Sequence, residues 1–245
     1  MLDAGHERRR CGRKRQHTGM RVLAILLAVA AHAHAAPCSG LANQLASTQG
    51  ATQLVTVVAS GYKRTTASLV LWERTPGSCW QRVAGPWRAR LGRSGLSDRK
   101  REGDGATPTG AYPLGPTVYG IAANPGLRSA YHRLVCGDWW DEDPYSSGYN
   151  TFRHLPCGKA PPFGGGSEAL WQATVAYQQF AVVEYNAHPV VHGRGSAIFL
   201  HDDIGGPTNG CISLPQEELL RLLRGLRPAA HPLIVIGTVA EIRTF

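Results

Sequence analysis

The sequence predicts a mainly β domain of the α+β class. Two observations support this prediction: short apolar or β-branched runs recur between turn-forming glycines and prolines, and only one segment has helical leucine spacing. With 245 residues, 43% of them hydrophobic, the chain is long enough for one large domain, which we expect at residues 51–240. The expected strands lie at residues 54–58, 68–72, 80–83, 180–185, 197–200 and 233–236.

The predicted helix follows Ser213. Four leucines between residues 219 and 226 follow the i, i+3, i+4, i+7 rule, so one face should pack on the sheets. Ser213 and Gln216 form an S-x-x-Q pattern around Pro215, which predicts a capping box at the start of the helix.

Residues 1–35 are typical of a secretory signal peptide. Basic residues precede an apolar run at residues 22–31, and Ala33-His34-Ala35 offers an A-x-A cleavage site. The run is about half as long as the roughly 20 residues that span a bilayer. We therefore expect export to the periplasm or cell wall, with no transmembrane helix after signal removal and with residues 36–50 as a linker. Translation could start at Met1 or at Met20.

The net charge of +9 is concentrated at the N-terminus. Residues 1–21 hold seven of the 26 basic residues and two of the 17 acidic ones, which leaves a charge of +4 on the rest. Because no basic stripe survives in that remainder, we expect no nucleic-acid partner.

Export would leave five cysteines in an oxidising compartment: Cys38, Cys79, Cys136, Cys157 and Cys211. Pairing by sequence proximity suggests Cys136 with Cys157 and Cys38 with Cys79. Cys211 is then the unpaired thiol. A lipid anchor on Cys38 is an alternative, although the residues before it make a poor lipobox.

Two loop regions are candidates for the rim of a site. Residues 92–115 are rich in glycine and charge, and residues 136–157 combine aromatic side chains, among them Trp140, with four carboxylates. We expect the second region to form a substrate wall. A solvated loop is the alternative, and a calcium site is disfavoured because no complete calcium-loop pattern is present.

The strongest chemical signal is His201 followed by Thr208-Asn209-Gly210-Cys211. The apolar run 197–200 predicts a buried strand that ends on the histidine, and a Cys/His pair supplies a nucleophile and its base. The helix that follows predicts a lowered pKa for the thiol, and the amides of Gly210 and Cys211 are candidates for stabilising an oxyanion. Asp202 or a backbone carbonyl would have to orient the imidazole ring.

Two alternatives compete with this Cys/His pair. Each residue could be structural, as lone histidines and cysteines usually are. A zinc site built from His188, His192 and His201 is the chemical rival, but Pro189 interrupts the helix that this spacing needs. We expect no metal and no organic cofactor.

Thr208-Asn209-Gly210-Cys211-Ile212 matches the Ser/Thr-x-Gly-Cys-hydrophobic signature of the L,D-transpeptidase catalytic domain family. With residues 193–201 before it, the upstream Thr107-Pro108-Thr109-Gly110 and the pair Tyr185-Asn186, the chain resembles that family. The resemblance implies a compact β-sandwich or barrel-like catalytic domain with a few short flanking helices, whose motif core spans residues 105–237.

The resemblance also implies a function. Cys211 would be the nucleophile and His201 the general base and acid, acting on peptidoglycan stem peptides through a thioester that an amine or water resolves. Gly210 and Thr208 would support the oxyanion loop, and the remaining predicted contacts would bind substrate. Those contacts are Tyr185, Asn186, Trp140 and Ser213.

Two positions depart from the usual family pattern, since many members have histidine at Asn209 and arginine or asparagine at Ser213. The functional alternatives are a non-catalytic wall-binding module and a cysteine amidase or peptidase acting on peptidoglycan. Papain-like enzymes place the cysteine first and the histidine far downstream, so the order found here disfavours them.

Overall fold

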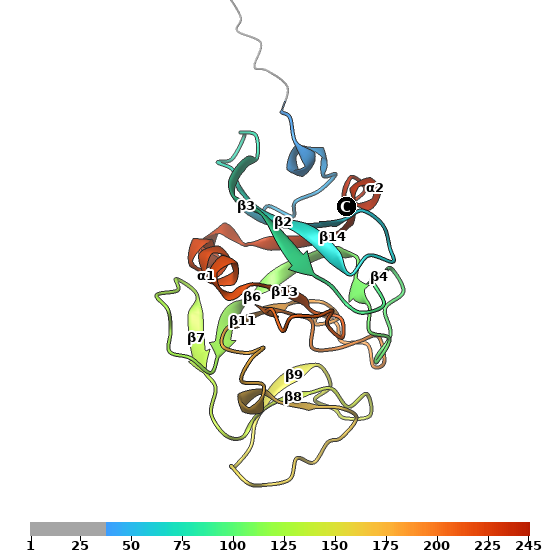
Figure 1. Cartoon of the computed structure of the whole chain (residues 1–245), viewed down its shortest axis with the longest axis vertical. Coiled ribbons are helices and arrows are strands. Elements are labelled where there is room, and N and C mark those ends of the chain that lie inside the picture. The colour runs from blue at the N-terminus through green and yellow to red at the C-terminus, as the bar shows by residue number, and fades with distance from the viewer. Residues whose placement is uncertain (1–37) are drawn as a thin grey trace, which may run out of the picture. The chain divides into compact units, whose positions relative to one another are not determined.

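The structure is a computed structural model that describes residues 38–245 (Figure 1). The predicted signal peptide lies outside the described residues. Residues 38–245 form one compact unit, and it is mainly β, as the sequence predicts. The strands are β1 (Gln53–Ala59), β2 (Thr66–Glu73), β3 (Gln81–Arg90), β4 (Leu96–Ser97), β5 (Thr107–Pro108), β6 (Gly110–Gly120), β7 (Ala130–Arg133), β8 (Asp138–Asp141), β9 (Thr151–His154), β10 (Glu168–Ala169), β11 (Phe180–Val183), β12 (Phe199–Asp202), β13 (Ile212–Leu214) and β14 (Leu233–Thr238). The helices are η1 (Leu41–Gln44), η2 (Leu170–Gln172), α1 (Gln216–Gly225), η3 (Pro228–Ala230) and α2 (Val239–Ile242).

The main sheet closes into a barrel. Its strands run in the order β11-β12-β13-β3-β2-β1-β14-β6, and β11 also pairs with β6, so the ends of the sheet meet. The pairs β1–β14 and β12–β13 are parallel, and the other pairs around the ring are antiparallel. Closure leaves β7 as an appended strand on β6.

The barrel core is built from alternate residues of these strands. Val55 and Val57 from β1, Leu200 from β12 and Ile236 from β14 are fully buried in it. Such alternation is the pattern that a sheet with one face on the core requires. The apolar runs that predict the strands therefore supply the core.

Helix α1 covers this core with its predicted leucine face, because Leu219, Leu222 and Leu223 have no exposed surface. The predicted capping box is wrong. The N-cap is Pro215, no side chain caps the helix, and Ser213 lies inside β13.

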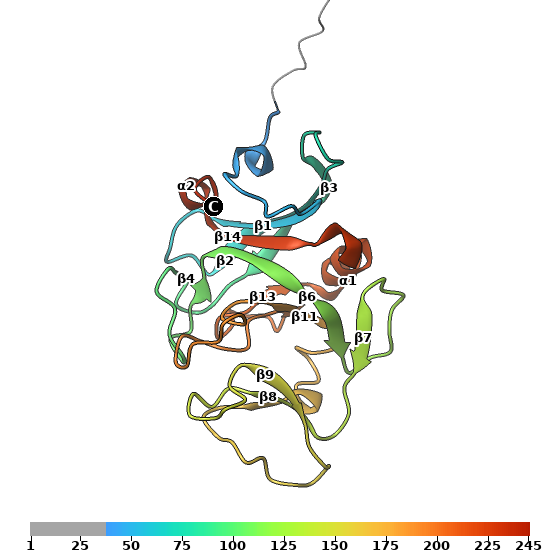
Figure 2. The same cartoon turned by 180° about the vertical axis from the view of Figure 1, so that it is seen from behind.

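A second, smaller sheet, β10-β8-β9, lies beside the barrel. In Figures 1 and 2 it is at the bottom, below β11 and β13, while β14 lies in the upper half, below α2. The Cys136–Cys157 disulfide closes the segment that contains β8 and β9, which confirms the pairing expected from proximity. A separate apolar core, with Trp140, Leu170, Tyr177, Phe180 and Phe199, fills the space between this sheet and the barrel.

Residues 36–50 are predicted to form a linker, but from Cys38 onward this segment is folded. Cys38 is joined to Cys79 by the other disulfide, so it carries no free thiol for a lipid. Helix η1 follows, and its Ala42 is buried in a third apolar cluster with Trp80 and Ile242. Residues 38–50 therefore belong to the folded unit and are not a linker.

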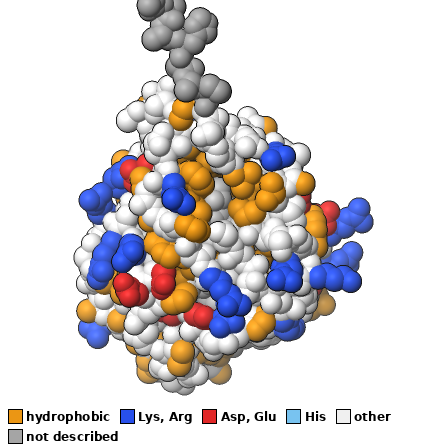
Figure 3. All heavy atoms as spheres, turned by 45° about the horizontal axis from the view of Figure 1, so that its top comes forward, with side chains coloured by type: hydrophobic (Ala, Val, Ile, Leu, Met, Phe, Trp, Pro, Cys, Tyr) orange, Lys and Arg blue, Asp and Glu red, His pale blue; other side chains and the backbone are white. Residues whose placement is uncertain are grey.

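Within residues 38–245, no helix has the length and apolar character needed to cross a bilayer. On the face shown in Figure 3, Lys and Arg side chains stand apart from one another, and apolar side chains gather toward the middle.

Candidate active site

Strands β12 and β13 bring Cys211 and His201 to the same face of the sheet. Their parallel register pairs Leu200 with Ile212 and His201 with Ser213. Leu200 and Ile212 point into the barrel core. Because side chains alternate along a strand, Cys211 and His201 both point to the opposite face, where the second core lies.

The loop before Cys211 is fixed by threonine hydroxyls. Thr208 is buried, its Oγ1 donates to the carbonyl of Cys211 at 2.7 Å, and it accepts from the N–H of Gly210 at 3.1 Å. Thr107, the first residue of the Thr-Pro-x-Gly element, accepts from the N–H of Gly92 at 2.8 Å and contacts the Cys211 carbonyl at 3.4 Å. The two sequence motifs are therefore parts of one hydrogen-bonded support.

Gly210 is required by its backbone conformation and its surroundings. Its φ is +142°, and a Cβ at this position would lie 2.9 Å from the carbonyl oxygen of Ala106. L-residues with a side chain rarely adopt this conformation. Glycine thus lets the chain turn beside the thiol.

The Cys211 side chain is half-buried, and the surroundings of its thiol favour the protonated form. Its Sγ donates to the carbonyl of Ala197 at 3.2 Å and accepts from the N–H of Phe199 at 3.4 Å. Burial, followed by the nearby carboxylate of Glu168, raises the pKa of this thiol far above its usual range. The predicted lowering of its pKa by a helix N-terminus is wrong, because β13 separates Cys211 from α1.

His201 is held as a neutral imidazole. Its Nδ1 lies 2.7 Å from the backbone carbonyl of Asp202, and a carbonyl can only accept, so Nδ1 carries the proton and Nε2 the lone pair. Burial lowers the pKa of the ring. A backbone carbonyl, and not the Asp202 carboxylate, therefore orients the histidine.

The Asp202 carboxyl accepts from the N–H of Gln179 at 3.0 Å, and its other oxygen has no partner within residues 38–245. Burial raises the pKa of this carboxyl to about 6.

Two cavities meet at Cys211. The first, of about 400 Å³, contains His201 and Tyr177 in its wall. The second, of about 380 Å³, is lined by charged side chains that include Arg93, Lys100 and Glu142. Cys211, Asn209 and Glu168 line both cavities.

Two carboxyl groups lie near the thiol: Glu142 belongs to the predicted substrate wall, whereas Glu168 is absent from the sequence prediction. Glu142 and Glu168 lie in the segment around the small sheet, and burial raises the pKa of both. The Oε2 of Glu168 accepts from the hydroxyl of Tyr177, whose ring meets the His201 ring edge-on at 5.8 Å between centroids. No motif or spacing marks Glu168, because its strand β10 has only two residues and leaves no pattern in the sequence.

Arg93 is a further residue that the sequence does not single out. Its backbone N–H donates to the carbonyl of Thr208 at 2.8 Å, and its guanidinium donates to the side-chain oxygen of Asn209. An exposed cation thus lies beside the position where many family members have histidine.

The predicted substrate contacts Trp140, Tyr185 and Asn186 line neither of the two cavities at Cys211. Trp140 and Tyr185 line a separate cavity of about 250 Å³ that contains neither Cys211 nor His201. Trp140 packs edge-on against Phe199 with ring centroids 5.0 Å apart. Asn186 binds its own loop, with its side chain donating to the carbonyls of residues 191 and 195.

Asn150 links these three positions to one another through hydrogen bonds. Its side-chain oxygen accepts from the indole N–H of Trp140 at 3.1 Å and from the N–H of Ala197 at 3.0 Å. Its side-chain nitrogen donates to the carbonyls of Tyr185 and Asn186 at 3.1 and 2.9 Å. This one buried side chain joins the small sheet to the strand that leads to His201.

Ser213 has no exposed surface, and its Oγ has no hydrogen-bond partner in the described part of the chain. Since it lies inside β13, a substrate in either cavity does not reach it.

The zinc alternative is not supported by the fold. His192 contacts the carbonyl of Pro144 at 2.6 Å, and His188 lies 3.6 Å from Glu184. Among residues 38–245, no three His, Cys, Asp or Glu side chains come together as metal ligands would.

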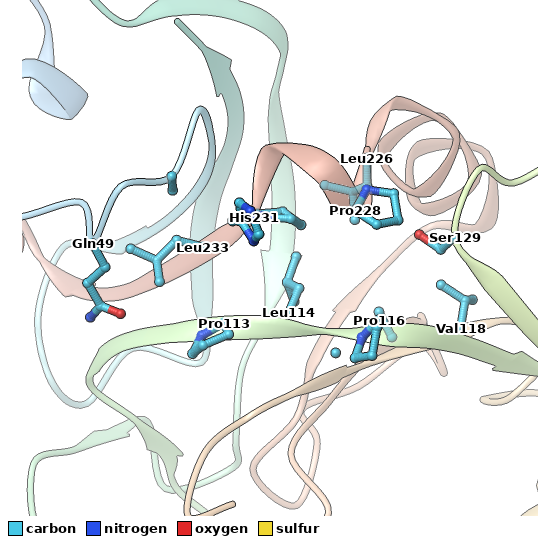
Figure 4. A pocket seen from close by; sticks show the side chains of 14 residues that line it. Gln49, Pro113, Leu114, Pro116, Val118, Ser129, Leu226, Pro228, His231 and Leu233 are labelled. Atoms are coloured by element: carbon cyan, nitrogen blue, oxygen red, sulfur yellow. The ribbon is translucent and has the colours of Figure 1, made fainter. Parts of the chain in front are cut away.

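A further cavity of about 400 Å³ lies apart from this site (Figure 4). Pro113, Leu114 and Pro116 from β6 form one of its walls, opposite Pro228 and His231 from the segment after α1. Its wall shares no residue with the two cavities at Cys211, and it contains no cysteine.

Comparison with known proteins agrees with this geometry. Residues 77–236 match the family model of the L,D-transpeptidase catalytic domain, a family of cysteine-dependent transpeptidases that act on peptidoglycan. The matched range starts at Gly77, just before β3, and thus earlier than the core expected at residues 105–237. A search of curated proteins gave no match. The match extends over more than half of the sequence and includes both Cys211 and His201, so this chain belongs to the L,D-transpeptidase catalytic domain family.

Proposed function

We propose that the chain is an exported peptidoglycan acyltransferase in which Cys211 forms a thioester with a stem peptide. The observation that carries this proposal is the presence of the Cys211 thiol and the His201 ring in the wall of one cavity. The two disulfides within residues 38–245 and the N-terminal signal pattern support export.

The ionisation of the two groups favours a neutral pair. The pKa of the thiol is raised and the pKa of the imidazole is lowered. Near neutral pH the Cys211 thiol therefore carries a proton, and the neutral His201 ring can accept it. In acylation, Sγ attacks the stem-peptide carbonyl while Nε2 of His201 takes the thiol proton. The same proton then passes to the leaving amine as the C–N bond breaks.

The developing oxyanion needs donors close to Sγ. The N–H of Gly210 is already bonded to Thr208, whereas the N–H of Cys211 has no partner within residues 38–245. We assign the Cys211 amide as an oxyanion donor, with the Thr208 hydroxyl holding the loop that aims it. Resolution of the thioester by an amine gives a cross-link, and resolution by water gives a trimmed stem.

The test is mass spectrometry of purified mature protein incubated with tetrapeptide-stem muropeptides. We expect an acyl adduct on Cys211, together with cross-linked or trimmed products. Cys211→Ala should abolish the adduct, and His201→Gln should slow its formation at least about 100-fold, the usual size of general-base catalysis.

The control is His188→Gln, which changes an exposed histidine outside both cavities. An adduct that survives Cys211→Ala would refute the assignment. Tight binding of muropeptides without any adduct would instead identify a non-catalytic wall-binding module. If products form only by cleavage of stem-peptide amide bonds that involve no D-configured residue, the chain would be a cysteine amidase.

A further inference from the structure

We propose that Glu168 is a second acid–base catalytic residue, which takes a proton from the ammonium group of the acyl acceptor. This inference rests on the proposed thioester function. It adds a residue that no motif marks, and it assigns the acceptor to the charged cavity beside Cys211.

The first argument is position. Glu168 is the titratable side chain, other than Cys211, that lines both cavities, so it borders the acyl group and any molecule that approaches from the charged side. Its Oε2 is fixed by the hydroxyl of Tyr177, and within residues 38–245 its Oε1 makes no hydrogen bond. One oxygen is thus anchored and the other is free to accept.

The second argument is the arrangement of the two bases. Tyr177 contacts the His201 ring with its own ring and Glu168 with its hydroxyl. The Tyr177 side chain therefore lies between two bases, His201 and Glu168. Both bases line the cavity that contains Cys211. Such an arrangement separates the thiol proton, which His201 handles, from the acceptor proton.

The third argument is charge. An amine acceptor is a cation near neutral pH and cannot attack until it loses a proton. Glu102 lines the charged cavity with Glu168 and favours a cation there. Burial raises the pKa of Glu142, in the same cavity, to about 9, so this carboxyl is mostly protonated near neutral pH. Burial raises the pKa of Glu168 and makes its carboxylate a stronger base than an exposed one. The titratable or charged groups around it are Cys211, Tyr177, Glu142, Glu102, Lys100, Arg93 and His201.

The proposed step balances as follows. The ammonium gives one proton to the Glu168 carboxylate and becomes a neutral amine. The amine lone pair forms a C–N bond to the thioester carbon, and the C–S bond breaks. His201 takes the second N–H proton and delivers it to the Cys211 sulfur. The protonated Glu168 then releases its proton through the open cavity to solvent.

The experiment compares two acceptors on a preformed thioester. The wild type and Glu168→Gln are acylated with a tetrapeptide stem and then mixed at pH 7 with methylamine or with hydroxylamine. Methylamine is a cation at this pH, whereas hydroxylamine is mostly neutral and needs no prior deprotonation. The matched control is Glu184→Gln, which changes another half-buried carboxyl that lines neither cavity.

We expect Glu168→Gln to form the adduct but to react with methylamine about 100-fold more slowly, while hydroxylamine changes less than about threefold. The methylamine deficit should shrink as the pH rises. Equal losses with both acceptors, or no loss with methylamine, would overturn the role of Glu168. A wild type that forms no thioester would refute the proposed function instead.

If Glu168→Gln does not fold, Tyr177→Phe decides the question. This variant keeps the ring against His201 and removes the hydroxyl that anchors Glu168. The ratio of methylamine to hydroxylamine rates should fall several-fold, and an unchanged ratio would count against the proposal.

Discussion

Replacement of Thr208 by valine should loosen the nucleophile loop without changing its shape. Valine has the size of threonine but no hydroxyl, so the substitution removes the 2.7 Å bond to the Cys211 carbonyl and the 3.1 Å bond from the Gly210 N–H. Each net hydrogen bond is worth about 1 kcal/mol, which predicts a loss of about 2 kcal/mol in the free energy of unfolding. For a domain of this size, that loss lowers the Tm by about 4–8 °C.

The comparison variant is Thr208→Ser, which keeps the hydroxyl and removes only a methyl group. It should cost about 1 kcal/mol, although serine fills less of this buried position than valine. The order of stability, serine above valine, is opposite to the order that packing alone would give. Thr117→Val, on β6, is the control for the chemical change, because the Thr117 hydroxyl makes no hydrogen bond within residues 38–245.

The same pair of variants separates stability from activity. If the hydroxyl aims the Cys211 amide, acylation of Thr208→Val should fall at least about tenfold, as small displacements of a catalytic group do, and Thr208→Ser should remain within about threefold of the wild type. Thermal unfolding by calorimetry and the rate of adduct formation by mass spectrometry measure the two effects. Equal Tm values and equal acylation rates for the valine and serine variants would refute the reasoning.

Three further predictions follow from the described contacts. Gly210→Ala places a Cβ 2.9 Å from the Ala106 carbonyl, so it should destabilise the domain and abolish the Cys211 adduct; an active, fully stable variant would contradict this. The folded pKa of Asp202, about 6, exceeds the ordinary 3.8. Its contribution to stability is therefore complete below about pH 4 and is lost as the pH rises through 6, by about 3 kcal/mol in all, and denaturant titrations of Asp202→Asn across this range should lack that dependence. The double variant Cys136→Ser with Cys157→Ser opens a loop with a sequence separation of 21, which should cost about 3 kcal/mol and slow the methylamine reaction; an unchanged midpoint of chemical unfolding would rule out that contribution.

The strands and the helix were predictable because burial leaves a periodic trace in the sequence. The runs at residues 54–58 and 233–236 and the leucine face of α1 each match a structural element. The run at residues 197–200 overlaps β12 only at Phe199 and Leu200, because the strand begins later and continues to Asp202. The disulfides were predictable from the number and spacing of cysteines, because an odd cysteine remained after proximity pairing. Barrel closure was not, since it depends on β11 pairing with β6 across a long stretch of chain.

The motif residues were predictable, but their ionisation was not. Ser213 and Gln216 match the capping-box pattern in the sequence. In the structure, however, Ser213 pairs with His201 in the register of β12 with β13 and is buried. The helix therefore starts too late to lower the pKa of Cys211, which is raised instead by burial and then by the carboxyl of Glu168. That carboxyl lies 43 positions upstream, in a segment whose geometry no local pattern specifies.

A neutral thiol also suits the compartment in which this chain is expected to act. A low-pKa thiolate attacks disulfides, and the folded unit contains two of them. With its pKa raised by burial and by Glu168, Cys211 stays protonated until a base takes the proton. His201, neutral and oriented by a backbone carbonyl, can do so when an acyl group reaches the sulfur. We therefore expect thiolate character at Cys211 to be confined to the moment of reaction.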